Sequence, residues 1–191
     1  AVKMGVKQAY GTPREFTTIT VDDGIAMGHE GMRSSLASRE AIADTVELTM
    51  RGHSYDAVVG LAGCDKSLPG MMMAMVRLNV PSVFIYGGSI LPGRAPQVDE
   101  IPEDFRTRDL TVQDMFEAVG RHQNNEMSDK ALDMLERVAC PSAGACGGQF
   151  TANTMACVSE AIGLALFNSS GMPAPYESRD ADCEASGRAV M

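Results

Sequence analysis

The feature that most constrains the fold of this 191-residue chain is a short apolar run, residues 57–62, without polar residues. A run without alternation is typical of a strand buried on both faces of a sheet, and such strands occur mainly in parallel sheets. A second run at residues 82–86 ends at Gly87-Gly88, and a helix is predicted between the two runs, over residues 71–78. Strands that alternate with helices predict an α/β fold, with a mostly parallel sheet and helices on both of its faces.

Further elements extend this pattern in both directions along the chain. Residues 15–21 contain Phe, Ile, Val and three Thr, which favours a strand. Apolar Ile42, Val46 and Met50 recur every four residues, so a helix is expected over residues 38–50. The other expected segments are helices at 1–10, 111–121, 128–139 and 151–167, a surface excursion at 94–109 and a linker at 168–176. We expect all 191 residues to form a single α/β domain.

Composition excludes several classes of function. The chain has 25 acidic and 16 basic residues and a formal charge of −9, the wrong sign for binding a phosphate backbone, so nucleic acid is not an expected partner. No run approaches the length of apolar sequence that a membrane span needs. Five cysteines, an odd number, do not indicate a secreted disulfide framework. We therefore expect a reducing compartment, which is the cytoplasm in a bacterium and a plastid or mitochondrion in a eukaryote.

Two loops bracketed by glycine each carry a cysteine. Residues 63–70 read Gly-Cys-Asp-Lys-Ser-Leu-Pro-Gly, and residues 140–148 read Cys-Pro-Ser-Ala-Gly-Ala-Cys-Gly-Gly. Flanking glycines let the backbone approach a ligand closely, so Cys64 and Cys146 are predicted to bind a metal or an iron–sulfur cluster. The alternative for Cys64 is a passive thiol in a surface turn. The other thiols are expected to be structural or incidental: Cys140 at a helix end, Cys157 within a helix and Cys183 in a polar tail.

Carboxylates accompany the first of these thiols. Asp65 and Lys66 follow Cys64 directly, and Asp23 lies in the turn sequence Asp22-Asp23-Gly24. Carboxylate oxygens are typical ligands of Mg²⁺. Turn chemistry for Asp23 and a salt bridge between Asp65 and Lys66 would explain the same residues without a metal.

Three loops are expected to meet at one edge of the sheet. In open α/β sheets, ligands bind beyond the carboxyl ends of the strands. Residues 22–24, 63–66 and 87–88 each follow a predicted strand directly. Their convergence is the main structural reason to expect a binding site here.

Four longer segments resemble the dihydroxy-acid dehydratase family, which also includes 6-phosphogluconate and sugar-acid dehydratases. They are residues 21–32, 38–40, 63–70 and 144–155, in the family's order and spread over nearly the whole chain. Residues 86–94 resemble the branched-chain biosynthetic members more closely. The resemblance implies a hydro-lyase that converts 2,3-dihydroxy-3-methyl acids into 2-oxo acids in valine and isoleucine biosynthesis. The alternatives are a sugar-acid (aldonate) dehydratase and a non-catalytic fragment without metal.

The resemblance also implies roles for individual residues. Cys64 and Cys146 match two of the three thiolates that hold the family's iron–sulfur cluster, with [2Fe-2S] favoured over [4Fe-4S]. Asp23 and Asp65 match ligands of Mg²⁺, and Lys66 matches a lysine that is carbamylated in the family. An ammonium group cannot bind a cation, whereas a carbamate offers oxygen ligands like those of a carboxylate. This chemistry explains a lysine beside Asp65.

The remaining site residues of the family have no match in this chain. The first cluster cysteine belongs to a segment that would precede Ala1. The last Mg²⁺ carboxylate and a serine base belong to a carboxyl-terminal domain that would follow Met191. The resemblance thus implies that residues 1–191 are an incomplete amino-terminal domain that contains no catalytic base and is inactive alone. The full-length protein is expected to be a homodimer that acts on a small dihydroxy acid.

Overall fold

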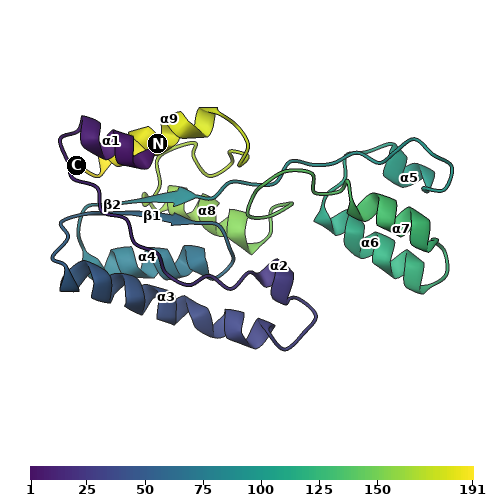
Figure 1. Cartoon of the computed structure of the whole chain (residues 1–191), viewed down its shortest axis with the longest axis horizontal. Helices are drawn as coiled ribbons and strands as arrows, with labels where there is room; N and C mark the ends of the chain where they lie inside the picture. Colours follow the sequence, from purple (N-terminus) through teal and green to yellow (C-terminus); the bar gives the residue numbers. More distant parts are fainter.

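Two parallel strands lie at the centre of the larger part of the molecule (Figure 1). In the computed structural model, which describes all residues from 1 to 191, β1 covers Val58–Ala62 and β2 covers Ser82–Tyr86. Val58 pairs with Ser82, and Ala62 pairs with Tyr86. Both strands lie where the apolar runs predict them, but the sheet has only these two strands and the chain is mostly helical.

The connection between the strands is α4 (Ser67–Leu78), which packs on the long helix α3 (Met32–Gly52). Helix α4 begins four residues earlier than predicted, because Pro69 lies in its first turn, where a backbone N–H is not needed. The two helices approach closely at Gly70, where an added Cβ would lie 2.7 Å from the carbonyl oxygen of Arg39. Asn79, with a left-handed φ of 53°, ends α4.

The other helices of this part surround the strands (Figure 1). Helices α1 (Val2–Gln8) and α9 (Ser178–Ala189) lie side by side, across the sheet from α3 and α4. Helix α8 (Thr151–Ala161) contacts both β2 and α4. The short helix α2 (Asp23–Ala26) is capped by Asp22, whose side chain accepts a hydrogen bond from the Ile25 N–H at 3.1 Å.

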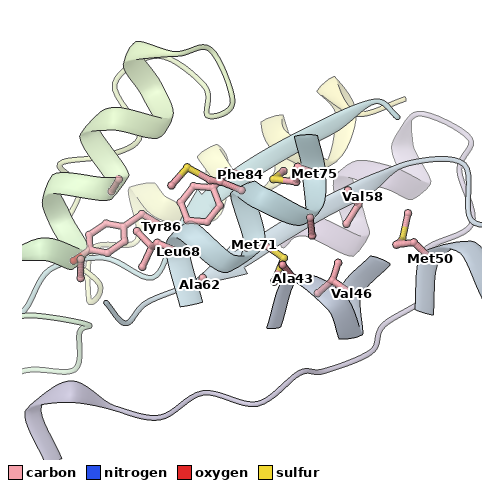
Figure 2. Packing of buried hydrophobic residues seen from close by; sticks show 14 residues of the cluster. Ala43, Val46, Met50, Val58, Ala62, Leu68, Met71, Met75, Phe84 and Tyr86 are labelled. Atoms are coloured by element: carbon pink, nitrogen blue, oxygen red, sulfur yellow. The ribbon is translucent and has the colours of Figure 1, made fainter. Parts of the chain in front are cut away.

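A core of 14 buried residues fills the space between the strands and the helices α3, α4 and α8 (Figure 2). Val46 and Met50 enter it from α3, Met71 and Met75 enter it from α4, and Phe84 enters it from β2. Phe84 is fully buried. The apolar residues that recur every four positions on α3 therefore form the face that packs into the core.

A second core of nine buried residues forms a separate lobe, residues 94–139, which projects from the rest (Figure 1). The lobe contains α5 (Glu103–Arg106), α6 (Val112–Gln123) and α7 (Asp129–Glu136). Its neck is closed by an antiparallel bridge in which Gly93 and Leu110 exchange two backbone hydrogen bonds, both 2.8 Å long. The lobe lies between β2 and α8 in the sequence.

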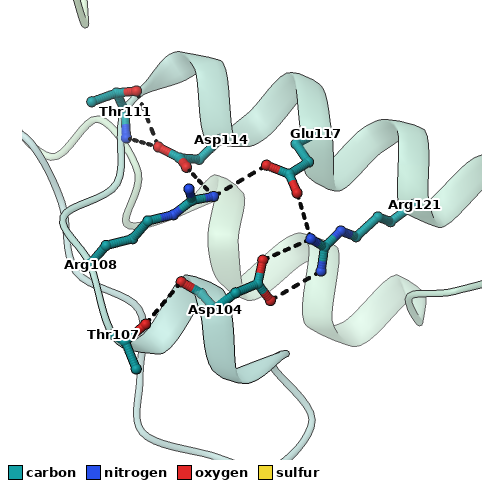
Figure 3. A network of polar contacts seen from close by, with 7 residues as sticks. All are labelled: Asp104, Thr107, Arg108, Thr111, Asp114, Glu117 and Arg121. Atoms are coloured by element: carbon teal, nitrogen blue, oxygen red, sulfur yellow. Dashed lines mark hydrogen bonds and ion pairs between the residues drawn. The ribbon is translucent and has the colours of Figure 1, made fainter.

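Ion pairs tie the helices of the lobe together at its surface (Figure 3). Arg121 donates to both carboxylate oxygens of Asp104, at 2.7 and 3.1 Å, and its guanidinium lies 4.8 Å from the centre of the Phe105 ring. Arg108 pairs with Asp114, the residue that completes the predicted capping box with Thr111. Asp104 and Arg108 are about half exposed, Arg121 is 29% exposed and Asp114 is 12% exposed. Ion pairs that water reaches contribute little, so the buried apolar residues are the main source of the lobe's stability.

The strand predicted over residues 15–21 is absent. This segment runs extended without a partner strand, and the Thr18 hydroxyl instead contacts the Thr45 hydroxyl at 2.7 Å, on α3. A composition that favours strands cannot make one where no strand edge is available. Asp22, Asp23 and Gly24 consequently do not follow a strand.

Three predictions near the carboxyl terminus and in the lobe were also wrong in part. Helix α8 ends at Ala161, not at residue 167, because Gly163 adopts a φ of +81° and Ala165 then forms a parallel bridge with Phe84. Cys183 lies in α9 and not in a polar tail. The supposed surface excursion at 94–109 belongs to the lobe, because it buries Ile101 and Phe105. No helix of the chain is both long and apolar enough to cross a membrane.

Candidate metal centre

The loops that follow β1 and β2 meet at the carboxyl edge of the sheet. The Gly87 N–H donates a hydrogen bond to the carbonyl oxygen of Ala62 at 2.7 Å. A Cβ on Gly87 would lie 3.0 Å from the Cα of Gly63, so both loops need glycine to come this close. The second cysteine loop joins them, because the Ala145 N–H donates to the Gly88 carbonyl oxygen at 2.7 Å.

Cys64 is held tightly where these loops meet. The residue is 7% exposed, and its Sγ accepts a hydrogen bond from the backbone N–H of Asp23 at 3.3 Å. Ser67 fixes the backbone of Cys64 through two short hydrogen bonds, one in each direction. Burial raises the pKa of the Cys64 thiol, and the Asp23 N–H opposes that rise. The predicted convergence of residues 22–24 with both strand ends is therefore present, although no strand leads into Asp23.

Asp23, Asp65 and Lys66 form a compact cluster of charges beside Cys64. The Nζ of Lys66 contacts the carboxylate of Asp65 and lies 3.8 Å from Oδ2 of Asp23. All three side chains are less than a fifth exposed. The Ser35 hydroxyl, which is fully buried on α3, donates to Oδ1 of Asp23. Two carboxylates and one ammonium give this partly buried cluster a net charge of −1.

The environment separates the proton affinities of the two carboxylates. Burial raises the pKa of Asp23, the neighbouring Asp65 adds to the rise, and Ser35 and Lys66 oppose it. Burial alone would also raise the pKa of Asp65, but the contacts with Asp23 and Lys66, together with the hydroxyl of Thr151, outweigh it and lower that pKa. Asp65 therefore stays ionised to a lower pH than Asp23 does.

The donor atoms of this cluster fit a hard divalent cation. Oδ1 of Asp65 is buried and has no hydrogen-bond partner, which leaves one oxygen free to bind a cation. The Lys66 ammonium stands between the two carboxylates and cannot itself be a ligand, whereas its carbamate would add oxygen. No group of three or more His, Cys, Asp or Glu side chains in the chain is arranged to hold a metal ion. A complete site therefore needs a modified Lys66 or ligands from beyond these residues.

Cys146 lies in the neighbouring loop and is partly buried. Its carbonyl oxygen accepts a hydrogen bond from the Ile90 N–H at 2.8 Å. A cavity of about 280 Å³ adjoins this loop and is lined in part by Thr111, Gly148 and Asn153. Thiols on short glycine-bracketed turns suit a soft or iron-containing group, so the chemistry of Cys64 and Cys146 fits such a ligand.

The remaining cysteines occupy different surroundings. Cys140 is exposed at the start of the second cysteine loop, and its Sγ lies 3.1 Å from the position of a Cβ on Gly147. Cys157 and Cys183 lie within α8 and α9. All five cysteines are free thiols in this structure.

Sequence reasoning missed two side chains of the cluster, Ser35 and Thr151. Ser35 shares the buried face of α3 with Ser38 and Ile42, at spacings of three and seven residues, and a serine on an apolar face was the available signal. Thr151 is the first residue of α8 and follows the second cysteine loop. Nothing in its spacing indicated a contact with Asp65.

Comparison with known proteins covers the whole chain. Residues 1–191 match the family model described as dihydroxy-acid/6-phosphogluconate dehydratase, N-terminal. Dihydroxy-acid dehydratases of Dinoroseobacter shibae, Parvibaculum lavamentivorans and Pelagibacter ubique are 81%, 73% and 69% identical over 191 residues. Each alignment covers 100% of this chain but only 31%, 31% and 32% of the respective relative. The chain thus spans about a third of the length of the curated relatives that it matches.

Proposed function

Because this chain belongs to the dihydroxy-acid/6-phosphogluconate dehydratase family, we propose that the intact protein is a hydro-lyase that acts on 2,3-dihydroxy-3-methyl acids. The products would be 2-oxo acids of branched-chain amino-acid biosynthesis. The observation that carries the proposal is the contact between Cys64 and Asp23, which joins a thiol to a cluster of carboxylates. A soft ligand and hard ligands within one small region suit a site with two different metal centres.

Cys64 and Cys146 would hold an iron–sulfur cluster, preferentially [2Fe-2S], with a further thiolate from outside residues 1–191. Asp23, Asp65 and the carbamate of Lys66 would hold Mg²⁺. When bound, these groups would supply Lewis-acid activation of a departing hydroxyl and an anchor for the substrate carboxylate. No residue of the chain is assigned as the general base.

The chain's own residues would set the positions of these ligands. Asp23 acts in both halves of the site, since its backbone N–H donates to Cys64 while its carboxylate faces Lys66. Ser35 orients that carboxylate from the buried face of α3. The close pairing of Gly63 and Gly87 holds the two loops together without side chains between them, which leaves room for a ligand at the edge of the sheet.

A sugar-acid dehydratase of the same family is the second candidate function. The family description names 6-phosphogluconate, but the relatives compared above are dihydroxy-acid dehydratases, which favours the branched-chain substrate. Steady-state assays of the intact protein on 2,3-dihydroxyisovalerate and on aldonates would separate the two. A kcat/KM at least tenfold higher on an aldonate would refute the branched-chain assignment.

We further propose that residues 1–191 are one incomplete α/β part of a larger homodimeric protein. The two-stranded sheet is small for the number of helices that cover it, which supports additional parallel strands in the intact protein. Light scattering with size-exclusion chromatography would give the mass of the assembly. A monomer at micromolar concentration would contradict the dimer.

Anaerobic purification of the intact protein tests the cluster directly. Iron and acid-labile sulfide should be present in the unmodified protein, and Cys64→Ala and Cys146→Ala should each lose most of both. Cys183→Ala is the matched control, because Cys183 lies in α9 and should leave the iron content unchanged. Full iron in Cys64→Ala would refute the assignment, and so would dehydratase activity in a protein free of iron.

A further inference from the structure

The outer edge of β1 has no partner strand. The Val58 N–H and the Ala62 carbonyl oxygen both form hydrogen bonds with residues that flank β2, at 3.0 and 2.7 Å. Because backbone groups point alternately to the two sides of a strand, Val59 and Leu61 direct theirs away from β2. No other strand or isolated bridge of the chain pairs with β1.

This edge lacks the features that protect a free edge. Charged side chains, proline and bulges keep an edge strand from pairing with other strands. Residues 58–62, Val-Val-Gly-Leu-Ala, contain no charge and no proline, and their register with β2 is continuous. Leu61 lies on the face opposite to α4, because the neighbouring Gly60 faces Met71 of that helix, and it is 59% exposed. The composition of β1 is that of a strand inside a sheet.

Residues 15–21 lie between α1 and α2 in the chain and run in the same direction as β1 (Figure 1). The Phe16 ring stacks on Tyr55, just before the amino end of β1, at a ring distance of 6.4 Å. The Val21 carbonyl oxygen lies 3.7 Å from the sulfur of Cys64, just after the carboxyl end of β1. The segment therefore passes β1 from one end to the other.

The segment has an unpaired backbone and the exposure pattern of a strand. Thr18 is partly buried, whereas Thr17 and Ile19 on either side of it are exposed. No residue from 15 to 21 takes part in a backbone–backbone hydrogen bond. The Thr18 hydroxyl contacts Thr45 of α3, so the segment rests on that helix and not on the edge of β1. An open strand edge and an unpaired extended segment thus follow the same course.

We propose that a strand from outside residues 1–191 inserts between β1 and residues 15–21 in the intact protein. This inference rests on the proposed function, in which the chain is one part of a larger protein. The relatives compared above leave room for such a strand, since this chain covers only 31% or 32% of their length. The added strand would pair with Val59 and Leu61 on one side and with the extended segment on the other.

The added strand is expected to be parallel to β1. β1 pairs with β2 in parallel, Phe84 forms a parallel bridge with Ala165, and purely parallel sheets are favoured. Its carboxyl end would then lie at the edge of the sheet that holds Cys64, next to the candidate metal centre. Two copies of β1 that meet across a two-fold axis would pair antiparallel and leave residues 15–21 unpaired, so we assign the strand to the same molecule.

Hydrogen exchange of the unmodified intact protein, resolved to single amides by NMR, tests the pairing. Gly60 and Ala62 are the internal reference, because their backbone groups point toward β2. If the strand is present, the amides of Val59 and Leu61 should exchange as slowly as this reference, within about tenfold. At an open edge, the same two amides should exchange at least about a hundredfold faster than the reference.

Photochemical cross-linking identifies the partner. A diazirine analogue of leucine is placed at position 61, and an equal mixture of unlabelled and isotope-labelled intact protein is irradiated and mapped by mass spectrometry. Cross-links should join position 61 to a segment outside residues 1–191 of the same isotopic form. The same analogue at position 135 is the matched control, because Leu135 is fully buried in the lobe and should react only within residues 94–139.

Each outcome decides the inference. Slow exchange of Val59 and Leu61, together with cross-links to a segment outside residues 1–191, supports it. Fast exchange at these two amides overturns it, and so do cross-links from position 61 that stay within residues 1–191 or join the two isotopic forms. Iron content and dehydratase activity are measured on the same preparation. Fast exchange in an active, iron-containing protein overturns the inference and leaves the proposed function intact, whereas slow exchange in an inactive, iron-free protein overturns only the catalytic assignment.

Discussion

The contact between Ser35 and Asp23 allows a quantitative prediction about metal binding. Ser35 is fully buried on α3, and its hydroxyl donates to one oxygen of a carboxylate that is less than a fifth exposed. A hydrogen bond to a charged group contributes about 1.5–3 kcal/mol. Because this hydrogen bond reaches only one of the two carboxylate oxygens of Asp23, we apply the lower end of that range to Ser35→Ala. Since 1.4 kcal/mol corresponds to a factor of ten, the affinity for Mg²⁺ should fall roughly tenfold.

Calorimetric titration of Mg²⁺ into the intact, iron-loaded protein, stripped of divalent cations and kept in bicarbonate buffer, would measure this change. Ser159→Ala is the matched control, because Ser159 is equally buried but donates only to the Ala156 carbonyl oxygen of its own helix, at 2.6 Å. Both variants should lose a similar amount of thermal stability. Equal Mg²⁺ affinities in Ser35→Ala and Ser159→Ala would refute the role assigned to Ser35.

Three further substitutions test separate parts of the structure. Lys66→Arg keeps a positive charge beside Asp65 but cannot form a carbamate. Mg²⁺ binding should therefore be lost, while the iron content stays unchanged. Retained Mg²⁺ binding would contradict the carbamate. Phe105→Ala removes the fully buried ring of the lobe and should lower the lobe's stability by about 3–5 kcal/mol. Amide hydrogen exchange should then become faster in residues 94–139 but not in α3 and α4. Equally faster exchange in both regions would show that the two cores are not independent. Gly70→Ala places a methyl group 2.7 Å from the Arg39 carbonyl oxygen. The resulting steric strain of about 1–3 kcal/mol should exceed the gain of about 1 kcal/mol from the higher helix propensity of alanine, so the melting temperature should fall. An unchanged or higher melting temperature would mean that α3 and α4 separate easily.

The strands could be predicted because each is a short, mainly apolar run that ends at glycine. These runs are residues 57–62 and 82–86. The expected burial on both faces holds for β2 but was wrong for β1, where Leu61 is 59% exposed. Residues 15–21 have the composition of a strand as well, but a strand also needs a partner edge, which local sequence does not reveal. The lobe was missed for a related reason, since its core joins Ile101 and Phe105 to helices that follow later in the chain.

The candidate site could be predicted as far as its residues are contiguous or follow strands. Cys64, Asp65 and Lys66 are neighbours in the chain, and the parallel strands carry their loop to the loop at Gly87. Ser35 was missed because it contributes one hydrogen bond from a helix that otherwise reads as ordinary core packing. Side-chain hydrogen bonds between elements depend on how the elements are placed, which composition and spacing do not specify.

The neck of the lobe lies at the base of the second cysteine loop. The Ile90 N–H donates to the Cys146 carbonyl oxygen, and the Leu91 N–H donates to the hydroxyl of Ser142, both at 2.8 Å, just before the bridge at Gly93. The chain thus enters and leaves the lobe through the backbone that positions Cys146. Cys146 therefore lies at the base of the lobe, whereas α5 lies at its far end (Figure 1). The lobe also contributes to the wall of the adjoining cavity, because Thr111 lines it together with Gly147 and Gly148 of the second cysteine loop.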